Sequence, residues 1–266
     1  MLHDVLAKTL NDQRRSLLSW TVAIALIVLM YAAIWPSIAG QPSLSDFLDQ
    51  MPAAFRNLFA TTGADMSTPV GYIQIELMSF MGPALVIVYA IGQGSAAIAG
   101  EEDRHTMDLL LSAPLSRTRI ILEKAAALVV GTAVLVTVTG TALVLEGRLF
   151  DLDLPLDGVT AAMLHLALLG LVFGGLALAL GAATGHLGLA RGIPAAFAVV
   201  AYLVNGLGGM VDWLNPLQRF SPFYQFAAHD PLRHGVSYPA TGVAVATLVV
   251  LVAMAVWGFR RRDVQG

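Results

Sequence analysis

Cysteine is absent from the 266-residue sequence, and charged side chains make up only 12% of it. The lack of cysteine excludes disulfides, thiol catalysis and cysteine-ligated metal sites. A soluble domain carries about 25% charged residues, so the chain has roughly half of the charge that a water-exposed surface needs. A hydrophobic content of 57% and a mean hydropathy of +0.73 indicate that lipid replaces water over much of the surface. The net charge of -3 predicts no nucleic-acid partner.

A phosphate-binding loop of the G-x-x-x-x-G-K-[ST] type is also missing. The chain has two lysines, Lys8 and Lys124, and neither follows such a glycine-rich stretch. Metal-ligand spacing is weak as well, because a pair of histidines five apart, His229 and His234 in an outer loop, is weak evidence alone, so no metal site is predicted. Any nucleotide-derived energy must therefore come from another chain.

Long apolar runs dominate what is present. Six segments reach the roughly 20 predominantly apolar residues that a helix needs to cross a bilayer, and their centres lack Asp, Glu, Lys and Arg. Backbone groups in lipid must be satisfied within the segment, and the strict alternation of a β-barrel is not seen. The predicted fold is therefore an all-α membrane protein, one transmembrane domain over residues 1–266. The predicted spans are residues 16–35, 75–99, 125–145, 159–183, 193–211 and 240–259.

The first span follows Arg14 and Arg15, and the Ser-Ile-Ala-Gly stretch at 37–40 resembles a signal-peptidase site. Its apolar run of about 20 residues exceeds the 7–15 of a secretory signal, so a retained anchor is favoured. Leucines at near-helical spacing before this span predict an amphipathic helix over residues 1–15 in the membrane interface. A frayed polar N-terminus is the alternative.

Basic residues are distributed unevenly between the two sides of the membrane. With six spans both termini share a side, and four of the 15 Lys and Arg residues fall on the other side. These four are Arg56, Arg148, Arg219 and Arg233. Because cytoplasmic loops carry the excess of Lys and Arg, the termini are predicted to be cytoplasmic and the protein to lie in the cytoplasmic (inner) membrane.

Polar and aromatic residues near the membrane mark further candidates. Aromatic rings interleave with prolines in the outer segment 212–239, which predicts short broken helices at the outer leaflet. An ordinary aromatic belt is the alternative to an outer gate. The candidate gate residues are Phe220, Phe223, Tyr224 and Phe226. The candidate pathway residues are Glu76, His165 and Asn205.

Plainer interpretations exist for several of these polar residues. Glu76 lies at interfacial depth, where a hydrated or paired acid is favoured over a functional one. His165 and Asn205 are expected to hydrogen-bond neighbouring helices. Glu123 and Lys124 are expected to extend their charged ends to the inner interface.

One stretch between the second and third spans combines charges with leucines. Met107, Leu110, Leu111 and Pro114 fall at i, i+3, i+4 and i+7, which places an apolar stripe on one face of a short helix. Such a short helix is marginal alone in water, so we expect it to dock in a groove of a partner. Packing on the membrane interface is the alternative.

The stretch AGEEDRHTMDLLLSAPLSRTRIILEK, residues 99–124, resembles the segment G-E-E-x-G-T-x-x-L-L-L-x-x-P-x-S-R of the ABC type-two transporter permeases. Lys124 matches a lysine that commonly opens the next span. His105 stands where that family usually has glycine, and this change is expected to alter a helix start. The Ser-Pro-Phe and Asp-Pro-Leu stretches within 212–239 agree as well. The matching positions are Gly100, Glu101, Glu102, Thr106, Leu109, Leu110, Leu111, Pro114, Ser116 and Arg117.

The resemblance implies that residues 101–116 form a coupling helix seated on a separate ABC ATPase subunit, which would bind ATP and Mg. This chain would then be a non-catalytic subunit without a cofactor, exporting an amphipathic, drug, peptide or lipid-like substrate. A second copy or a paralogue would complete the assembly, with a homodimer as the default. The partner-binding residues implied are Glu101, Glu102, Thr106, Met107, Leu110, Leu111, Pro114 and Arg117.

Other functions stay open at this point. An assembly or maturation transporter, or an ion efflux system, would have the same architecture. An ion-coupled carrier would need mid-membrane acids and discontinuous helices, which are not evident. An intramembrane hydrolase could use Ser95 with His165 or His186, but residues 92–96 lack the G-x-S-x-G turn, and small-residue packing explains them better.

Overall fold

The computed structural model describes residues 5–39, 50, 52, 54, 58, 64–107 and 115–262. Every regular element in these residues is a helix, and six helices are long and apolar enough to cross a membrane. The predicted six-span, all-α membrane fold is therefore confirmed. The spans are α1 (Val5–Ile38), α4 (Pro69–Ile73) continued by the π-helix η1 (Gln74–Met81) and α5 (Gly82–Ala97), α8 (Arg117–Leu149), α9 (Leu156–Thr184), α10 (Leu187–Leu207) and α14 (Tyr238–Arg261).

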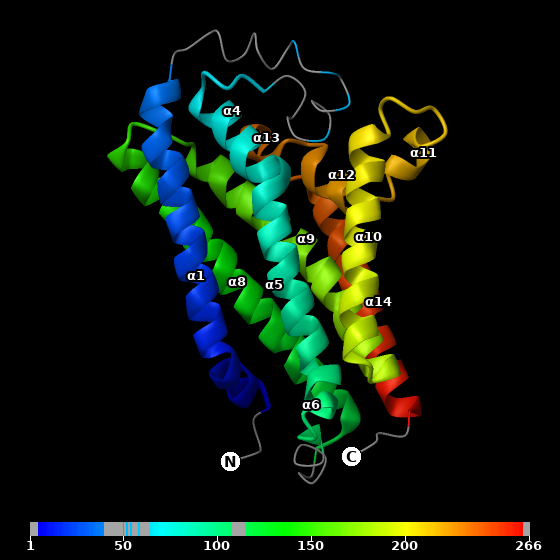
Figure 1. Ribbon diagram of the computed structural model, residues 1–266. Helices are drawn as coiled ribbons and strands as arrows, with labels where there is room; N and C mark the ends of the chain where they lie inside the picture. The colour runs from blue at the N-terminus through cyan, green and yellow to red at the C-terminus, as the bar shows by residue number, and fades with distance from the viewer. Residues whose placement is uncertain are drawn as a thin grey trace.

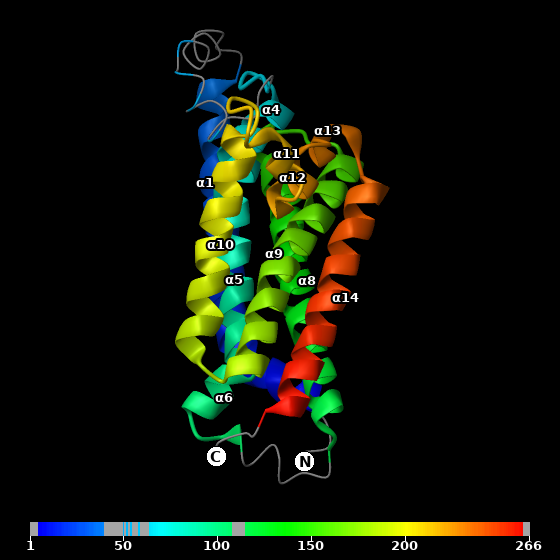
Figure 2. The same ribbon diagram turned by 90° about the vertical axis from the view of Figure 1, so that its right-hand side faces the viewer.

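Helix α9 forms the centre of the bundle. It packs against α5, α8, α10 and α14, and it is the most buried of the six spans. Small residues make this possible, because a Cβ atom added at Gly94 of α5 would lie 2.1 Å from the Gly174 carbonyl oxygen of α9. Figure 1 shows α1 and α8 on one side of this centre, and Figure 2 shows α10 and α14 separated across it.

The N-terminal helix is longer than predicted. Residues from Val5 onward belong to α1, so the described part of the predicted interfacial segment 1–15 is continuous with the first span. The Leu6 N–H donates to a Glu123 carboxylate oxygen at 3.0 Å, and Val5 and Thr9 are buried. The first turns of α1 therefore pack on α8 instead of forming a separate element.

Short helices precede the last span, as the prolines predicted. They are α11 (Asn215–Gln218), α12 (Pro222–Ala227) and α13 (Pro231–His234), each with proline in its first turn. The Ser221 hydroxyl donates to the Ala201 carbonyl at 2.9 Å and accepts from the Phe223 N–H, which fixes α12 against α10.

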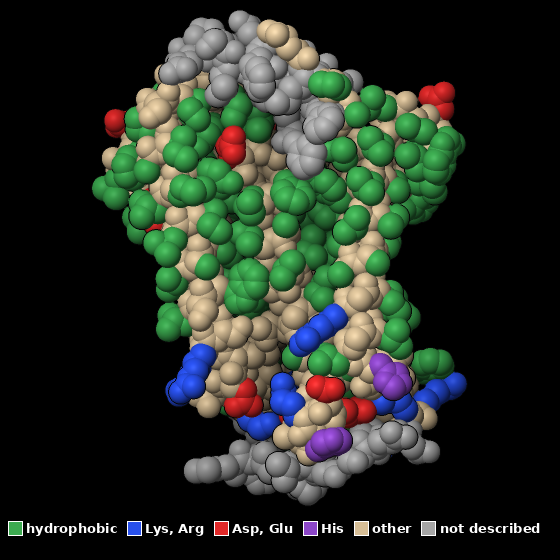
Figure 3. All heavy atoms as spheres, in the orientation of Figure 1, with side chains coloured by type: hydrophobic (Ala, Val, Ile, Leu, Met, Phe, Trp, Pro, Cys, Tyr) green, Lys and Arg blue, Asp and Glu red, His purple; other side chains and the backbone are tan. Residues whose placement is uncertain are grey.

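The first and last described residues lie at the same end of the bundle, which we call the basal end (Figure 1). Helices α11, α12 and α13 lie at the opposite, distal end. In Figure 3, Lys and Arg side chains gather at the basal end, and hydrophobic side chains cover most of the face above them. This distribution is typical of a bundle whose middle faces lipid.

Candidate functional site

The second span ends in a short helix that turns an acid inward at the basal end. Helix α5 ends at Ala97, and α6 (Ala99–Asp103) follows after Ile98, whose backbone dihedral angles are not helical. Glu101 of α6 is only 5% exposed, whereas Asp103, two residues later on the same short helix, faces solvent. The inward acid needs compensating charge, because an unpaired buried carboxylate is costly.

Lysines from two other helices supply that charge. Lys124 of α8 donates to a Glu101 carboxylate oxygen at 2.8 Å, and Lys8 of α1 lies 3.7 Å from the same oxygen. The second carboxylate oxygen accepts from the Thr106 hydroxyl and lies 4.0 Å from an Arg104 nitrogen. We call these five residues the basal cluster; it joins α1, α6 and α8.

The electrostatics of the basal cluster favour a charged Glu101. Burial alone would raise the pKa of this carboxyl group, but the Lys124 ion pair, the hydrogen bonds from Lys124 and Thr106, and the charge of Lys8 outweigh it. Together they lower the pKa to about 2. Glu101 is therefore an anion at any physiological pH.

Two further contacts connect this region to the last span. Arg262, which follows α14, forms an ion pair with Glu102 of α6. Arg117, at the start of α8, donates to the carbonyl oxygens of Phe259 at 2.9 Å and Arg262 at 2.6 Å. Arginine thus satisfies carbonyl groups that the end of α14 leaves without helical partners. The residues on both sides of the segment 108–114 are therefore fixed to the bundle.

Met107 points into the bundle. It is 1% exposed and packs in an apolar cluster with Ile120, Ile121 and Phe259. The sequence predicted that residues 107–114 form one helix whose apolar face contacts a partner. Leu110, Leu111 and Pro114 lie outside the described residues.

His105 lies between the end of α6 and Met107, whose backbone is again helical. Its φ of 55° is in the left-handed region, and it follows the end of α6 at the position where helices commonly place glycine. The chain therefore changes direction before Met107. The glycine of the resembling motif therefore has a backbone reason at this position, between the end of α6 and the helical Met107.

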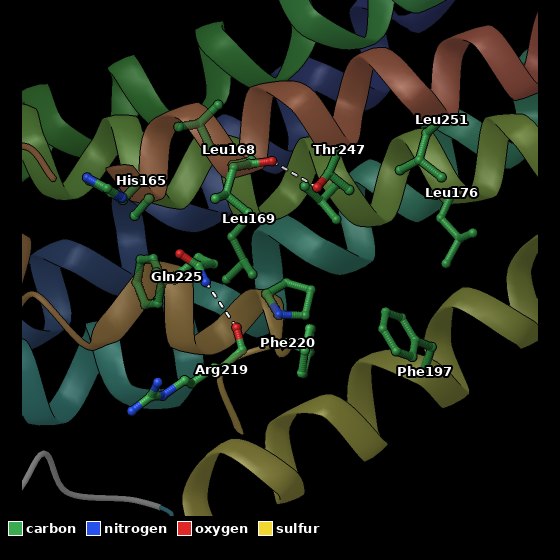
Figure 4. A pocket seen from close by; sticks show the side chains of 16 residues that line it. His165, Leu168, Leu169, Leu176, Phe197, Arg219, Phe220, Gln225, Thr247 and Leu251 are labelled. Atoms are coloured by element: carbon green, nitrogen blue, oxygen red, sulfur yellow. Dashed lines mark hydrogen bonds between the residues drawn. The ribbon is translucent and has the colours of Figure 1, made fainter. Parts of the chain in front are cut away.

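A cavity of about 330 Å³ lies at the distal end between α9, α10, α12 and α14 (Figure 4). We call it the distal pocket. The residues that line it are His165, Leu168, Leu169, Val172 and Leu176 of α9, Phe197 of α10, Arg219, Phe220, Pro222, Gln225 and Phe226 around α12, and Ala240, Val243, Ala244, Thr247 and Leu251 of α14.

The predicted gate residues lie at two cavities, the distal pocket and a second one. Phe220, 84% exposed, and Phe226, 6% exposed, both line the distal pocket. Phe223 is buried, and its ring lies 5.8 Å from that of Phe173 and 5.3 Å from that of Tyr202. Phe223, Tyr224 and Phe226 all line the second cavity, to which Asn205 also contributes.

The predicted pathway residues are not brought together in one cavity. Glu76 lies on η1 and lines neither of the two cavities. The His165 Nε2 atom accepts from the Ser237 N–H at 3.1 Å, in the distal pocket. The backbone carbonyl of Asn205, at the second cavity, accepts a hydrogen bond from the Gln218 side-chain amide at 2.8 Å. His165 and Asn205 thus connect their helices to the distal loop.

A family model described as multidrug efflux system permease Rv1217c, C-terminal domain, matches residues 2–260. The chain belongs to this family. It is a multi-pass membrane permease, as the six spans and the predicted resemblance to exporter permeases indicated. The comparison with curated proteins gave no match.

Two basal residues of the permease were misinterpreted or missed from sequence. Lys124 was expected to extend to the membrane interface, but its side chain is 2% exposed and paired with Glu101. The role of Arg262 was not predicted, because its partner Glu102 is 160 residues away in the chain. The sequence did not single out Glu101 as the buried acid, because charged residues also occupy positions 102–104 and only the fold buries Glu101.

The hydrolase alternative needs a base at the Ser95 hydroxyl, and in the described part of the chain this hydroxyl contacts Gly92 and Arg191. Ser95 is fully buried; its hydroxyl donates to the Gly92 carbonyl at 3.1 Å and accepts from Arg191 at 3.3 Å. Ser95 lies near the basal end of α5, whereas His165 lies at the distal pocket.

Proposed function

We propose that the chain is the membrane subunit of an ATP-binding-cassette exporter. A separate ABC ATPase subunit binds ATP and Mg, and its motion reaches the spans through residues 101–117. The observation that carries this proposal is the basal network, in which Glu101 contacts α1 and α8, and Glu102 contacts the end of α14. Membership in an efflux permease family supports the same direction of transport.

The contacts at the basal end support different roles for the parts of this segment. Residues 101–107 and 115–117 hold the segment to the bundle through buried charges and through Met107. Residues 108–114, outside the described structure, are the proposed contact with the ATPase subunit, because they contain the leucine triplet. When the ATPase subunit moves residues 108–114, helices α1, α8 and α14 would move with them. Motion passes through these helices because packed, hydrogen-bonded elements connect them to the segment.

A second copy of the chain, or a paralogue, completes the proposed exporter. The least buried spans are α1, α10 and α14, whose apolar faces are free for lipid or for another permease subunit. Both termini lie on the cytoplasmic side in this arrangement, because Lys and Arg side chains gather at the basal end (Figure 3). The cargo is a drug-like lipophilic or amphipathic molecule, in line with the family description and with spans whose centres lack charge.

The test separates contact with the ATPase from transmission of its motion. Leu110→Asp should abolish co-purification of an ATPase subunit while the permease still inserts. Glu102→Arg should keep that co-purification but lower the substrate transported per ATP hydrolysed, because it opposes Arg262. Adding Arg262→Glu restores the ion pair with reversed charges and should recover transport.

Asp103→Asn is the matched control, since Asp103 is exposed on the same helix. Transport and ATP hydrolysis are measured in proteoliposomes that contain the native complex. The proposal fails if no ATPase subunit accompanies the wild-type chain, or if Glu102→Arg transports as much per ATP as Asp103→Asn.

A further inference from the structure

The distal pocket opens sideways, between two spans. Helices α10 and α14 both pack on α9 but lie on opposite sides of it (Figure 2). The pocket residues that face this gap remain exposed, with Phe197 of α10 at 42% and Val243 of α14 at 50%. Neighbouring side chains on both helices are exposed and apolar as well, so the opening faces the hydrocarbon of a bilayer.

The polar side chains around the distal pocket already have partners within the protein. His165 accepts from the Ser237 N–H, the Gln225 amide donates to the Arg219 carbonyl at 3.1 Å, and the Thr247 hydroxyl donates to the Val243 carbonyl at 2.8 Å. Figure 4 shows the last two bonds and shows the Arg219 guanidinium pointing away from the pocket. The hydrogen bonds of these side chains are therefore made within the protein.

The pocket offers no charge to a ligand with a net charge. Its 16 lining residues include no Asp or Glu, and the guanidinium of the single arginine points away from the pocket. Moving an ion into such a site without a counter-charge is strongly unfavourable. An uncharged molecule carries no such cost, so the lining selects for neutral compounds.

The size and the rings of the pocket specify the ligand further. Its 330 Å³ falls within the range of about 300–1,000 Å³ that holds drug-sized molecules. Phe197, Phe220 and Phe226 lie around it, and aromatic rings favour offset or edge contacts with other rings. A ring-bearing lipophile fits this lining better than a flexible polar chain.

We propose that the distal pocket binds uncharged, ring-bearing lipophilic molecules, which enter from the bilayer between α10 and α14. That such a ligand is an export substrate rests on the proposed function; that it binds here does not. Transfer from lipid to an apolar site brings no hydrophobic gain, so binding depends on shape and ring contacts. Such binding is weak and tolerant, which suits a permease that must release many compounds.

The test uses the full-length chain in lipid nanodiscs without ATP. An uncharged phenyl-diazirine photoprobe is crosslinked, and labelled residues are mapped by mass spectrometry. Label should concentrate on Leu169, Phe197 and Leu251, and excess diphenylhexatriene should displace it. The trimethylammonium derivative of the same competitor should displace it several-fold less, because it adds a charge to the same ring system.

A pair of α14 variants tests the position of the site. Ala244→Trp fills the pocket and should reduce the pocket label several-fold, whereas Ala246→Trp, on the exposed face outside the lining, should not. Label spread evenly over the exposed side of α14, or a charged competitor as effective as the neutral one, would overturn the proposal. The competition on wild-type protein stands even if Ala244→Trp fails to fold. Because no transport is measured, a failure of the exporter assignment would leave this result unchanged.

Discussion

Replacing Glu101 with glutamine should destabilise the bundle by about 3 kcal/mol, and two routes give that magnitude. The ion pair with Lys124 is buried, with side-chain exposures of 6% and 2%, and removing one partner of a buried pair costs about 3–5 kcal/mol. Independently, lowering the Glu101 pKa from 4.5 to about 2 corresponds to about 3 kcal/mol at about 1.4 kcal/mol per pKa unit. The variant loses this stability because Lys124 stays buried without the carboxylate that pairs with it.

The two single variants should differ, because the partners are not equivalent. Lys124→Met leaves Glu101 with Lys8 at 3.7 Å and with the Thr106 hydroxyl, whereas Glu101→Gln leaves Lys124 without its ion-pair partner. Glu101→Gln should therefore be the more harmful, and the double variant should cost less than the sum of the two.

Thermal unfolding of the purified protein in detergent measures this difference. A loss of about 3 kcal/mol lowers Tm by on the order of 5–10 °C, while Asp103→Asn, the exposed control, should leave it unchanged. Since folding lowers the Glu101 pKa, the stabilisation is complete above about pH 4.5 and is lost as the pH falls toward 2. The advantage of wild type over Glu101→Gln should shrink over the same interval. A Tm for Glu101→Gln equal to that of Asp103→Asn, or a greater loss in Lys124→Met, would refute the reasoning.

Two further predictions concern packing. Gly94→Leu should prevent α5 from packing on α9 and abolish a monodisperse peak in size-exclusion chromatography, because any Cβ would meet the Gly174 carbonyl; Gly92→Leu, with nothing within 4 Å, is the control and should behave as wild type. Phe223→Ala should cost about 3–5 kcal/mol of stability in thermal unfolding, since its ring is buried, whereas Phe220→Ala should cost almost none. Equal behaviour within either pair would contradict the packing described.

Much of the candidate site was visible in the sequence, but the contacts that it makes within its own chain were not. Glu101, Glu102 and Met107 were identified from the motif as partner-binding residues. In the structure all three contact helices of their own chain. A motif identifies which positions are constrained; it does not say whether the constraint comes from another chain or from this one.

The sequence by itself determined the number of spans, the helical class and the broken distal segment. These depend on local properties: the length of an apolar run, the need to satisfy its backbone in lipid, and the effect of proline on a helix. Such properties need no knowledge of distant neighbours, and for this reason the six spans and the short helices before α14 were predicted correctly.

Only the tertiary structure decided which polar groups face inward and where a ligand can lie. Glu101 and Asp103 are both acids on one short helix, yet one is buried and the other exposed, because Lys8 and Lys124 approach one side only. The distal pocket likewise combines residues from His165 to Leu251 on four helices. Burial and cavities are properties of surfaces brought together across the chain, and no local pattern contains them.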